Sequence, residues 1–407
     1  MRKTDLRAYA RLIARTGVRV QPGQSVVIAA KLDQPEFVTM LAEECYKAGA
    51  ENVTVEWSHQ PLQKLHVKYR SDETLARVEK WQLEKLKHQV ETLPCRITLF
   101  SEDPDGLKGV DRAKMARGQQ ARSKLTKPYR EKREGKVQWC VACVPSRGWA
   151  KKVFPELRPA AAVEKLWQMI LQVSRVYGDP EKNWEEHNRD LHARCAYLNG
   201  LHIRRLHYKS ANGTALTVGM IPEARFCGGD GKDQSGVAYN ANIPSDECYS
   251  TPKRDETEGI VYSSKPLSWQ SGIIDKFWLR FEHGKVVDCG AETGEALLRK
   301  MISMDEGASY FGEVALVPWD SPINRTGVLF YNTLIDENAS CHFALGSGYI
   351  DTIEGYTERS REEIHALGLN DSMIHVDFMI GTADLRIDAE LEDGKTVPIF
   401  RDGTWAF

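Results

Sequence analysis

The sequence predicts an α/β N-terminal domain with a mostly parallel sheet, followed by a β-rich α+β domain. Short apolar runs alternate with amphipathic helical segments in the first half, and short strands separated by glycines fill the second half. The chain has 407 residues, which leaves room for two domains at ~150 residues each. We expect an α/β domain at residues 1–185 and a β-rich domain at residues 186–407.

The first half is predicted to contain a βαβ unit that is then extended. Residues 25–30 and 52–56 have the composition of strands, and residues 34–48 between them have the apolar spacing of a helix. Further apolar runs at 96–100 and 136–146 continue the alternation. Because strands joined by helical crossovers lie parallel, we expect one mostly parallel sheet with covering helices.

The pattern of the sequence changes from helical to strand-like after residue 200. Helical periodicity from about residue 155 to 200 predicts a connector. Asn212 and Gly213 then lie between two strand-like segments, and this dipeptide is the strongest short-range signal of a β-hairpin. Short strands follow to the C-terminus, so the second domain is predicted to be rich in β-structure.

Composition narrows the classes of partner. The net charge is -2, from 55 basic and 57 acidic side chains, so the chain offers no overall field for nucleic acid or acidic membranes. No apolar stretch reaches the ~20 residues of a membrane helix, and the N-terminus lacks the apolar core of a signal peptide. The nine cysteines are an odd number without regular spacing, which indicates reduced thiols. We therefore expect a cytoplasmic protein with a small or peptide-like ligand.

Potential metal ligands occur in four segments of the second half. His375 and Asp377 in IHVDFMIG are two residues apart in an apolar run typical of a strand, so both side chains leave the same face. Imidazole and carboxylate are both metal ligands near neutral pH. A histidine hydrogen-bonded to a neighbouring carboxylate is the alternative interpretation of this pair.

The second segment is FYNTLIDENASCHFALGSGY, residues 330–349, which contains Asp336, Glu337, His342 and Tyr349. Its two final glycines let the backbone turn tightly, which would allow the tyrosine to approach the histidine. A solvated loop is the alternative interpretation of this string.

Two further segments add carboxylates. Glu313 in YFGEVALVP lies at the mouth of an apolar run, where an unpaired carboxylate would be costly to bury. Asp246 and Glu247 in NIPSDECYSTP lie in a proline-flanked turn. Exposed acidic residues of a turn are the alternative interpretation of this last pair.

Together these four segments resemble the thermophilic aminopeptidase family of metallopeptidases, also called the aminopeptidase T or aminopeptidase S family. The resemblance runs in order through NxPxxE, GEVALVP, NTLxDENAxCHxALGxxY and HVDFMIG. It implies a homodimer, an active-site role for Tyr349 and a position close to both metals for Glu313. Cys248 departs from the pattern and would place a thiol beside the metal. The resemblance implies that two divalent metals, Zn, Co or Mn, are held by Glu247, Glu313, Glu337, His342, His375 and Asp377.

We therefore expect an aminopeptidase that hydrolyses N-terminal residues from peptides through a metal-activated water. Glu313 would move the proton of that water, and Tyr349 would donate a hydrogen bond to the oxyanion. The surplus acids Asp246, Asp336 and Glu337 would attract the amino group of a peptide. Two alternatives stay open: a two-metal hydrolase of another bond, such as a phosphoester, and a metal-stabilised peptide-binding protein.

Three other motifs give weaker indications of a metal, phosphate or dinucleotide site. Cys140 and Cys143 have zinc-knuckle spacing, but no second pair follows and their run has the composition of a buried strand. The glycines at 228–231 are not followed by the Lys-Ser/Thr of a phosphate-binding loop. The first strand is not followed by G-x-G-x-x-G, so we expect no dinucleotide cofactor.

Overall fold

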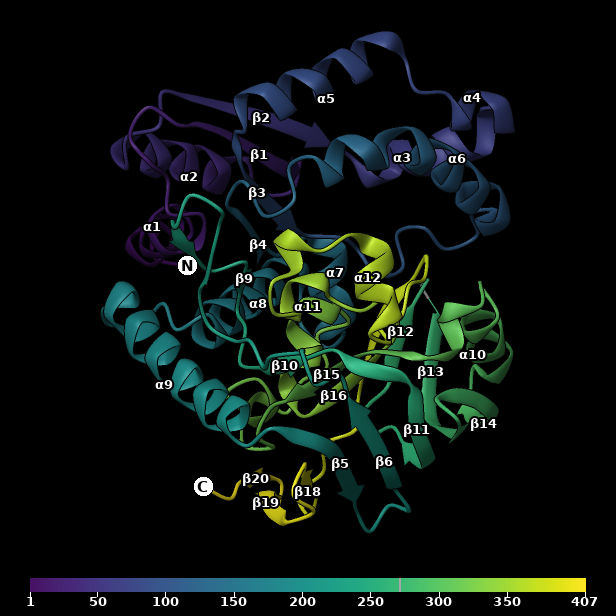
Figure 1. The fold of residues 1–407 in the computed structure, drawn as a ribbon. Helices are drawn as coiled ribbons and strands as arrows, with labels where there is room; N and C mark the ends of the chain where they lie inside the picture. The colour runs from purple at the N-terminus through teal and green to yellow at the C-terminus, as the bar shows by residue number, and fades with distance from the viewer. Residues whose placement is uncertain (271) are drawn as a thin grey trace. The chain divides into compact units, whose positions relative to one another are not determined.

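The computed structural model describes residues 1–270 and 272–407, which form two compact units. The first unit comprises Met1–Glu185 and Asp230–Pro244, and the second comprises Glu186–Gly229 and Ser245–Phe407. The long helix α9 (Pro180–Gly200) carries the chain from the first unit into the second (Figure 1). The predicted boundary after residue 185 would assign residues 230–244 to the second domain, whereas in the structure they belong to the first unit. These residues rejoin the first unit because their strand pairs with its sheet, and local sequence patterns do not reveal such distant pairing.

The first unit is built on a parallel sheet with the strand order β2-β1-β3-β4-β9. Strand β1 pairs in parallel with both β2 and β3, and its middle residues are apolar and buried, as expected of a strand covered on both faces. This confirms the predicted mostly parallel sheet. The strands are β1 (Ser25–Lys31), β2 (Asn52–Ser58), β3 (Cys95–Phe100), β4 (Trp139–Cys143) and β9 (Asn242–Ile243).

Helices connect and flank these strands. Tyr9, Phe37 and Trp167, from three different helices, pack ring against ring with centroids 5.3 to 6.4 Å apart. This aromatic cluster ties the first, second and eighth helices together. The helices are α1 (Lys3–Leu12), α2 (Pro35–Lys47), α3 (Gln60–Tyr69), α4 (Asp72–Ala76), α5 (Lys80–Thr92), α6 (Arg112–Glu131), α7 (Arg147–Val153) and α8 (Pro159–Val173), and a short pair of strands, β7 (Gly231–Lys232) and β8 (Ala238–Tyr239), precedes β9.

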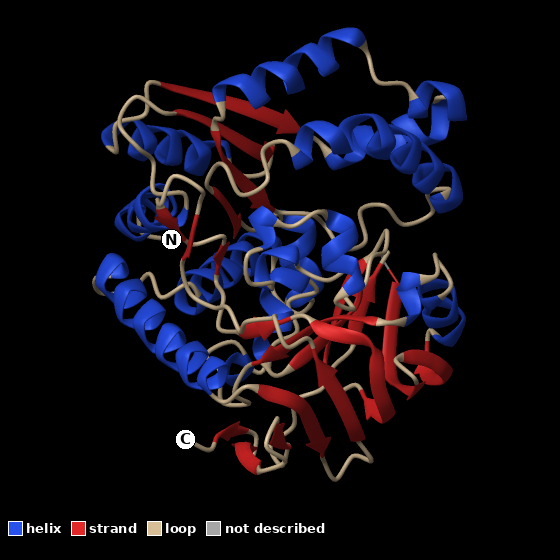
Figure 2. Cartoon of the chain, in the orientation of Figure 1, coloured by secondary structure: helices blue, strands red, loops and turns tan. Residues whose placement is uncertain are grey.

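The second unit contains an antiparallel sheet with the order β12-β13-β11-β6-β5-β18-β19-β20, in which β14 also pairs with β13 (Figure 2). The hairpin predicted at Asn212 and Gly213 is confirmed, because β5 and β6 pair on either side of it and Gly213 has a φ of 105°. The strands are β5 (Ile203–Lys209), β6 (Ala215–Met220), β11 (Pro252–Tyr262), β12 (Leu267–Trp269), β13 (Gly272–Glu282), β14 (Lys285–Thr293), β18 (Arg386–Leu391), β19 (Thr396–Arg401) and β20 (Thr404–Trp405).

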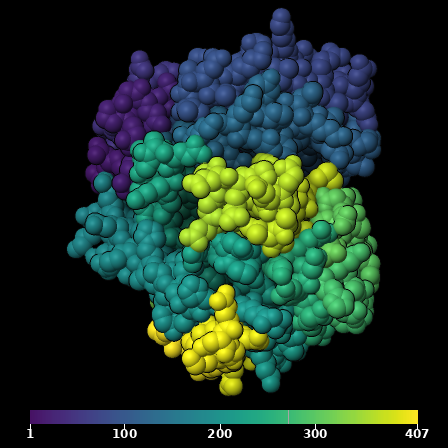
Figure 3. Space-filling view, in the orientation of Figure 1, coloured from purple at the N-terminus to yellow at the C-terminus, as the bar shows by residue number. Residues whose placement is uncertain are grey.

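A second antiparallel sheet of this unit has the order β10-β15-β16-β17, and we call it the site sheet. Three short helices accompany the two sheets, and the part of the chain that includes α12 reaches the molecular surface (Figure 3). The elements are β10 (Cys248–Ser250), β15 (Phe311–Leu316), β16 (His342–Gly346) and β17 (His375–Met379), with α10 (Glu295–Ile302), α11 (Thr333–Asp336) and α12 (Arg361–Ala366).

A β-bulge in β15 determines which way its side chains face. Phe311 pairs with Leu345 and Glu313 pairs with Ala344, so Gly312 is an extra residue between two consecutive pairs. In a regular strand, residues two apart, such as Phe311 and Glu313, would face the same side. The bulge instead sends Phe311 into the core and Glu313 to the opposite face.

We predict that Gly312→Ala destabilises the protein by about 1–3 kcal/mol, the range for overpacked sites. A Cβ at this position would lie 2.3 Å from the carbonyl oxygen of Ser347 and 2.4 Å from that of Gly346. Urea denaturation followed by circular dichroism measures the change. Gly200→Ala is the matched control, because a Cβ there meets nothing within 4 Å. Equal stability of both variants would contradict the steric argument.

Candidate metal centre

The predicted metal ligands lie on one face of the site sheet. Ala344 of β16 pairs with Glu313 of β15 and with Asp377 of β17, and paired residues of antiparallel strands face the same side. His342 is two residues from Ala344, and His375 is two residues from Asp377, so both imidazoles share this face. The alanine between the two carboxylates leaves space where a larger side chain would fill the centre of the site.

The opposite face of the same strands is part of the hydrophobic core. Val314, Phe343 and Phe378 are fully buried there, and Phe311 stacks on Phe343 with centroids 4.4 Å apart. Alternation along each strand therefore places the polar site directly above closely packed apolar side chains. Such packing restricts the strands and fixes the positions of the ligands.

His375 is oriented by a backbone carbonyl. Its Nδ1 lies 2.7 Å from the carbonyl oxygen of Ser347, which requires the proton on Nδ1 and leaves the lone pair on Nε2. Nε2 lies 3.0 Å from Glu313 Oε2 and 3.2 Å from Asp377 Oδ1. The hydroxyl of Tyr349 is 3.1 Å from the same nitrogen, so this tyrosine contacts the second histidine of the site. An imidazole held by a carbonyl on one nitrogen and facing carboxylates with the other is typical of metal sites.

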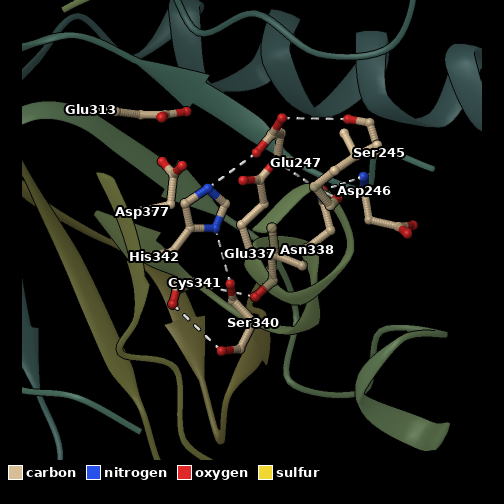
Figure 4. A network of polar contacts seen from close by, with 12 residues as sticks. Ser245, Asp246, Glu247, Glu313, Glu337, Asn338, Ser340, Cys341, His342 and Asp377 are labelled. Atoms are coloured by element: carbon tan, nitrogen blue, oxygen red, sulfur yellow. Dashed lines mark hydrogen bonds and ion pairs between the residues drawn. The ribbon is translucent and has the colours of Figure 1, made fainter. Parts of the chain in front are cut away.

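His342 is held in the same manner (Figure 4). Its Nδ1 lies 3.2 Å from the carbonyl oxygen of Ser340, and its Nε2 lies 3.2 Å from Glu247 Oε2. The hydroxyl of Ser245 donates to the other carboxylate oxygen of Glu247 at 3.5 Å. Both histidines therefore direct Nε2 at buried carboxylates.

Two groups of potential ligands meet among the residues that the structure describes. The first is Glu247, Glu313 and His342, and the second is Glu313, His375 and Asp377. In each group one ligand atom per residue lies within 4.8 Å of the others. Because Glu313 belongs to both groups, its carboxylate lies between two potential cation positions.

Glu337 enters the site from the turn that follows α11 and belongs to neither group. Its side chain is hydrogen-bonded to Asp377, and its Oε1 accepts a hydrogen bond from Asn338 Nδ2 at 3.4 Å. Figure 4 shows it beside Glu247 and His342. The site therefore contains a further carboxyl group next to the ligand groups.

The donor set fits divalent metal ions. Every potential ligand offers an imidazole nitrogen or a carboxylate oxygen, which are the donors that Zn, Co and Mn accept. Asp377 Oδ1 is buried and has no hydrogen-bond partner among the described residues, although His375 Nε2 lies 3.2 Å away. A buried carboxylate oxygen is costly in this state, and a cation would satisfy it.

The electrostatics of the site favour positive charge. Burial raises the pKa of Glu313 to about 7, and the charges of Asp377 and Glu247 act in the same direction. Burial and the neighbouring carboxylates raise the pKa of Glu337 well above its usual range. Although burial disfavours the charged form of His342, its hydrogen bond to Glu247 and the surrounding carboxylates raise its pKa to about 9.

Two acids expected near the substrate serve other roles. Asp336 accepts hydrogen bonds from the backbone of Phe330 at 2.7 Å and of Asn332 at 2.9 Å, so it shapes its own loop. The side chain of Asp246 points away from the ligands (Figure 4), and its Oδ1 lies 3.7 Å from His187 Nε2. These contacts place both acids away from the ligand groups and give no support to the expectation that they attract the substrate amine.

The cysteines lie outside the ligand groups. Cys248 is next to Glu247 in sequence, but it faces the hydrophobic core, where its thiol lies 3.9 Å from the carbonyl oxygen of Leu191. It is therefore not the metal neighbour that its position in the motif suggests. Cys140 and Cys143 are buried in β4, as their apolar run predicts, and neither belongs to a ligand group among the described residues.

Two buried asparagines support the site and were missed by sequence reasoning. Asn338 accepts a hydrogen bond from the backbone of Asp246 at 2.7 Å and donates to the carbonyl oxygen of Leu334 at 3.3 Å. Asn370 donates to the carbonyl oxygen of Gly346 at 2.6 Å and holds the end of β16. Asn338 lies within the DENA string of the second motif, and this position is the only sequence feature that could have indicated its role.

Comparison with known proteins identifies the family. The thermophilic metalloprotease family, M29, matches residues 2–405. The chain belongs to this family. Aminopeptidase AmpS of Bacillus subtilis strain 168 is 42% identical over 404 residues, which cover 99% of this chain and 98% of that protein. Aminopeptidase T of Thermus aquaticus is 38% identical over 403 residues, which cover 98% of each chain.

The fold of a solved M29 relative agrees with the present one. Wild-type AmpT from Thermus thermophilus superimposes with a TM-score of 0.92 at 36% identity, and the match covers 100% of both chains. The resemblance found in the sequence is confirmed, and M29 membership identifies the chain as a metalloprotease, a hydrolase. These relatives do not favour a phosphoesterase or a peptide-binding protein. In the described part of the chain, no helix has the length and apolar character needed to cross a membrane.

The pKa shifts predict how the stability of the metal-free protein varies with pH. The pKa of Glu313, about 7, exceeds its unfolded value of ~4.3, so the folded state binds more protons and stability falls as pH rises through that window. The stabilisation from His342, with a pKa of about 9, is complete below pH ~6.5 and is lost as pH rises to 9. We expect the Tm of chelated protein to fall from pH 5 to 9 in calorimetry.

Added divalent metal should raise this Tm most at the alkaline end, because ligands must be deprotonated to bind. Burial also raises the pKa of Asp336 to about 7, but that residue lies outside the ligand groups. The metal-dependent part of the shift therefore reports on the site. A Tm of metal-free protein that rises across the window would contradict this interpretation.

Proposed function

We propose that this protein is an aminopeptidase that removes N-terminal residues from peptides with two divalent metal ions. The observation that supports two ions is the sharing of Glu313 by two ligand groups. Glu247 and His342 would complete one site, and His375 and Asp377 would complete the other. The names of the M29 relatives, aminopeptidases AmpS and T, support the reaction.

Bound divalent ions would polarise the scissile carbonyl and lower the pKa of a water molecule, so that hydroxide is available near neutral pH. Zn, Co and Mn are the proposed metals, because the donors are imidazole and carboxylate. Tyr349 would donate a hydrogen bond to the oxyanion. Although Tyr349 is 38% exposed, desolvation of its hydroxyl and the charges of Glu313 and Asp377 raise its pKa well above the usual range, which keeps the hydroxyl protonated as a donor.

The structure leads us to propose Glu337 as the carrier of the water's proton. A carboxylate shared by two ions has little remaining basicity, which argues against Glu313 in this role. Glu337 is outside both groups, is partly buried and is hydrogen-bonded to Asp377. It is also the acid that remains near the site after Asp246 and Asp336 are set aside, so it could hold the substrate's amino group before the proton is transferred.

Assembly as a homodimer and location in the cytoplasm remain predictions. The first rests on the family resemblance alone. The second rests on the nine cysteines, which are free in the described residues.

We predict that metal content separates the ligand roles. Elemental analysis should find two ions per wild-type chain, about one in His342→Ala and His375→Ala, and fewer than one in Glu313→Ala, since Glu313 serves both groups. Glu337→Gln should keep two ions but lose turnover. His207→Ala is the matched control, because His207 pairs with Glu390 outside the ligand groups. Retention of as much metal in Glu313→Ala as in His342→Ala would rule out the shared position.

Tyr349→Phe should keep both ions and the Tm but lower kcat about 100-fold, the typical cost of one lost oxyanion donor. Steady-state kinetics on a chromogenic aminoacyl substrate measure this loss. Tyr197→Phe removes a hydroxyl from a tyrosine that stacks on Phe407 and should behave as wild type. An unchanged kcat in Tyr349→Phe would reduce Tyr349 to a packing residue.

The reaction itself is tested with short peptides that differ at their ends. We expect cleavage of peptides with a free N-terminus, no cleavage after N-acetylation, and tolerance of an amidated C-terminus. A chelator should abolish release of amino acids, and added divalent metal should restore it. Cleavage of the acetylated peptide at a comparable rate would identify an endopeptidase or carboxypeptidase instead.

A further inference from the structure

The first unit contains a cavity whose lining is rich in cationic side chains. It has a volume of about 360 Å³ and lies between α5, α6 and the sheet strands β2 and β3. Figure 1 shows the two helices running next to these strands. Glu56 is the acidic residue in its lining. The cationic residues of the lining are Lys85, Arg96, Arg122, Lys127, Arg130 and Arg133.

The charge of Glu56 is already compensated. Its Oε1 lies 2.7 Å from Lys85 Nζ, and its Oε2 lies 3.3 Å from Arg96. The side-chain amide of Gln89 also donates to Oε1 at 3.4 Å. Lys127 lies 3.8 Å from Glu131 Oε1. The excess of positive charge is therefore carried by the arginines of the lining, Arg122, Arg130 and Arg133.

Arg133 is the cation of this cavity whose hydrogen-bonding groups are least satisfied among the described residues. Its guanidinium donates to Gln89 Oε1 at 3.2 Å, but its Nε is buried and has no hydrogen-bond partner among the described residues. Burial lowers the pKa of Arg133, and the charge of Arg96 acts in the same direction. A buried guanidinium donor without a partner beside a second cation is costly unless an anion is present.

In a neighbouring cavity, two arginines are paired with acidic side chains. It has a volume of about 520 Å³, lies against α4 and α6, and contains Arg77 and Arg117 in its lining. Arg117 lies 2.6 Å from Asp72, and Arg77 lies within 3.9 Å of Glu73. Two of the three cations in this lining are thus paired and Lys124 is the third, so the cavity has a smaller excess of positive charge and we infer no site there.

We propose that the cavity around Arg133 binds a multiply charged anion of the phosphate class. Four of its six cations are arginines, whose planar donor groups match phosphate oxygens in pairs. Coulomb attraction grows with ligand charge, so phosphate, at about -1.5 to -2, is favoured over a single carboxylate. The cavity volume lies within the ~300–1,000 Å³ of small-molecule sites. Trp81 in the lining is 64% exposed and offers a face on which a nucleoside base can stack.

Isothermal titration calorimetry on the full-length, metal-loaded protein tests the proposal. We expect diphosphate to bind wild type, and Arg133→Gln to weaken its binding about 10-fold or more through loss of charge-assisted hydrogen bonds. Arg117→Gln, in the neighbouring cavity, should bind as wild type. Without ligand, Arg133→Gln should have an equal or higher Tm than wild type, because it removes the repulsion with Arg96. If Arg133→Gln is unstable, Arg130→Gln at an exposed helix position must still weaken binding.

Three ligands separate the possible sources of the anion. Tighter binding of a nucleoside diphosphate, lost in Trp81→Ala, would identify a nucleotide, and equal binding of diphosphate alone would identify the inorganic anion. Both outcomes support the site. Acetate at matched ionic strength should not bind. The proposal is overturned if diphosphate fails to bind, if acetate binds as well, or if both arginine variants bind as wild type, since phosphate would then be held elsewhere, such as at the metal centre.

Discussion

The removal from water of four carboxyl groups, three buried and one partly buried, on one side of the site sheet is the constraint on which the rest of the second unit depends. Desolvation of each charged group costs several kcal/mol unless a partner compensates it. The charge of Glu247, Glu313, Glu337 and Asp377 equals that of two divalent cations when the histidines are neutral, the state in which imidazole binds metal. The hydrogen bonds to backbone carbonyls at both histidines serve this balance, because they hold the lone pairs toward the carboxylates.

One sheet supplies both the site and the core beneath it. The two-residue alternation of β16 sends His342 to the site and Phe343 to the core, and the extra Gly312 restores the same alternation in β15. The near-zero net charge of the chain conceals an opposite arrangement elsewhere: the second unit concentrates negative charge around its ligands, and the first concentrates positive charge around Arg133. A count over the whole chain excludes global attraction to a polyanion, but it does not describe either local field.

The sequence predicts those features that follow from short-range spacing. The parallel sheet, the hairpin at Gly213 and the shared face of His375 and Asp377 all follow from periodicity within a few residues. Spacing alone does not distinguish the adjacent acids Asp336 and Glu337, and the family resemblance is what singled out Glu337 as a ligand. The direction of each side chain depends on a helical turn and on backbone donors outside that turn. The return of residues 230–244 and the cationic cavity depend on contacts between segments far apart in sequence.

The order of the proposed ligands along the chain has a consequence for biosynthesis. Glu247 is made first, Glu313 and His342 follow, and His375 and Asp377 come from the last strand to join the site sheet. No earlier fragment contains both ligand groups, so a nascent chain cannot assemble the complete centre. With the ligands proposed above, each chain would gain activity only after this last strand has been made.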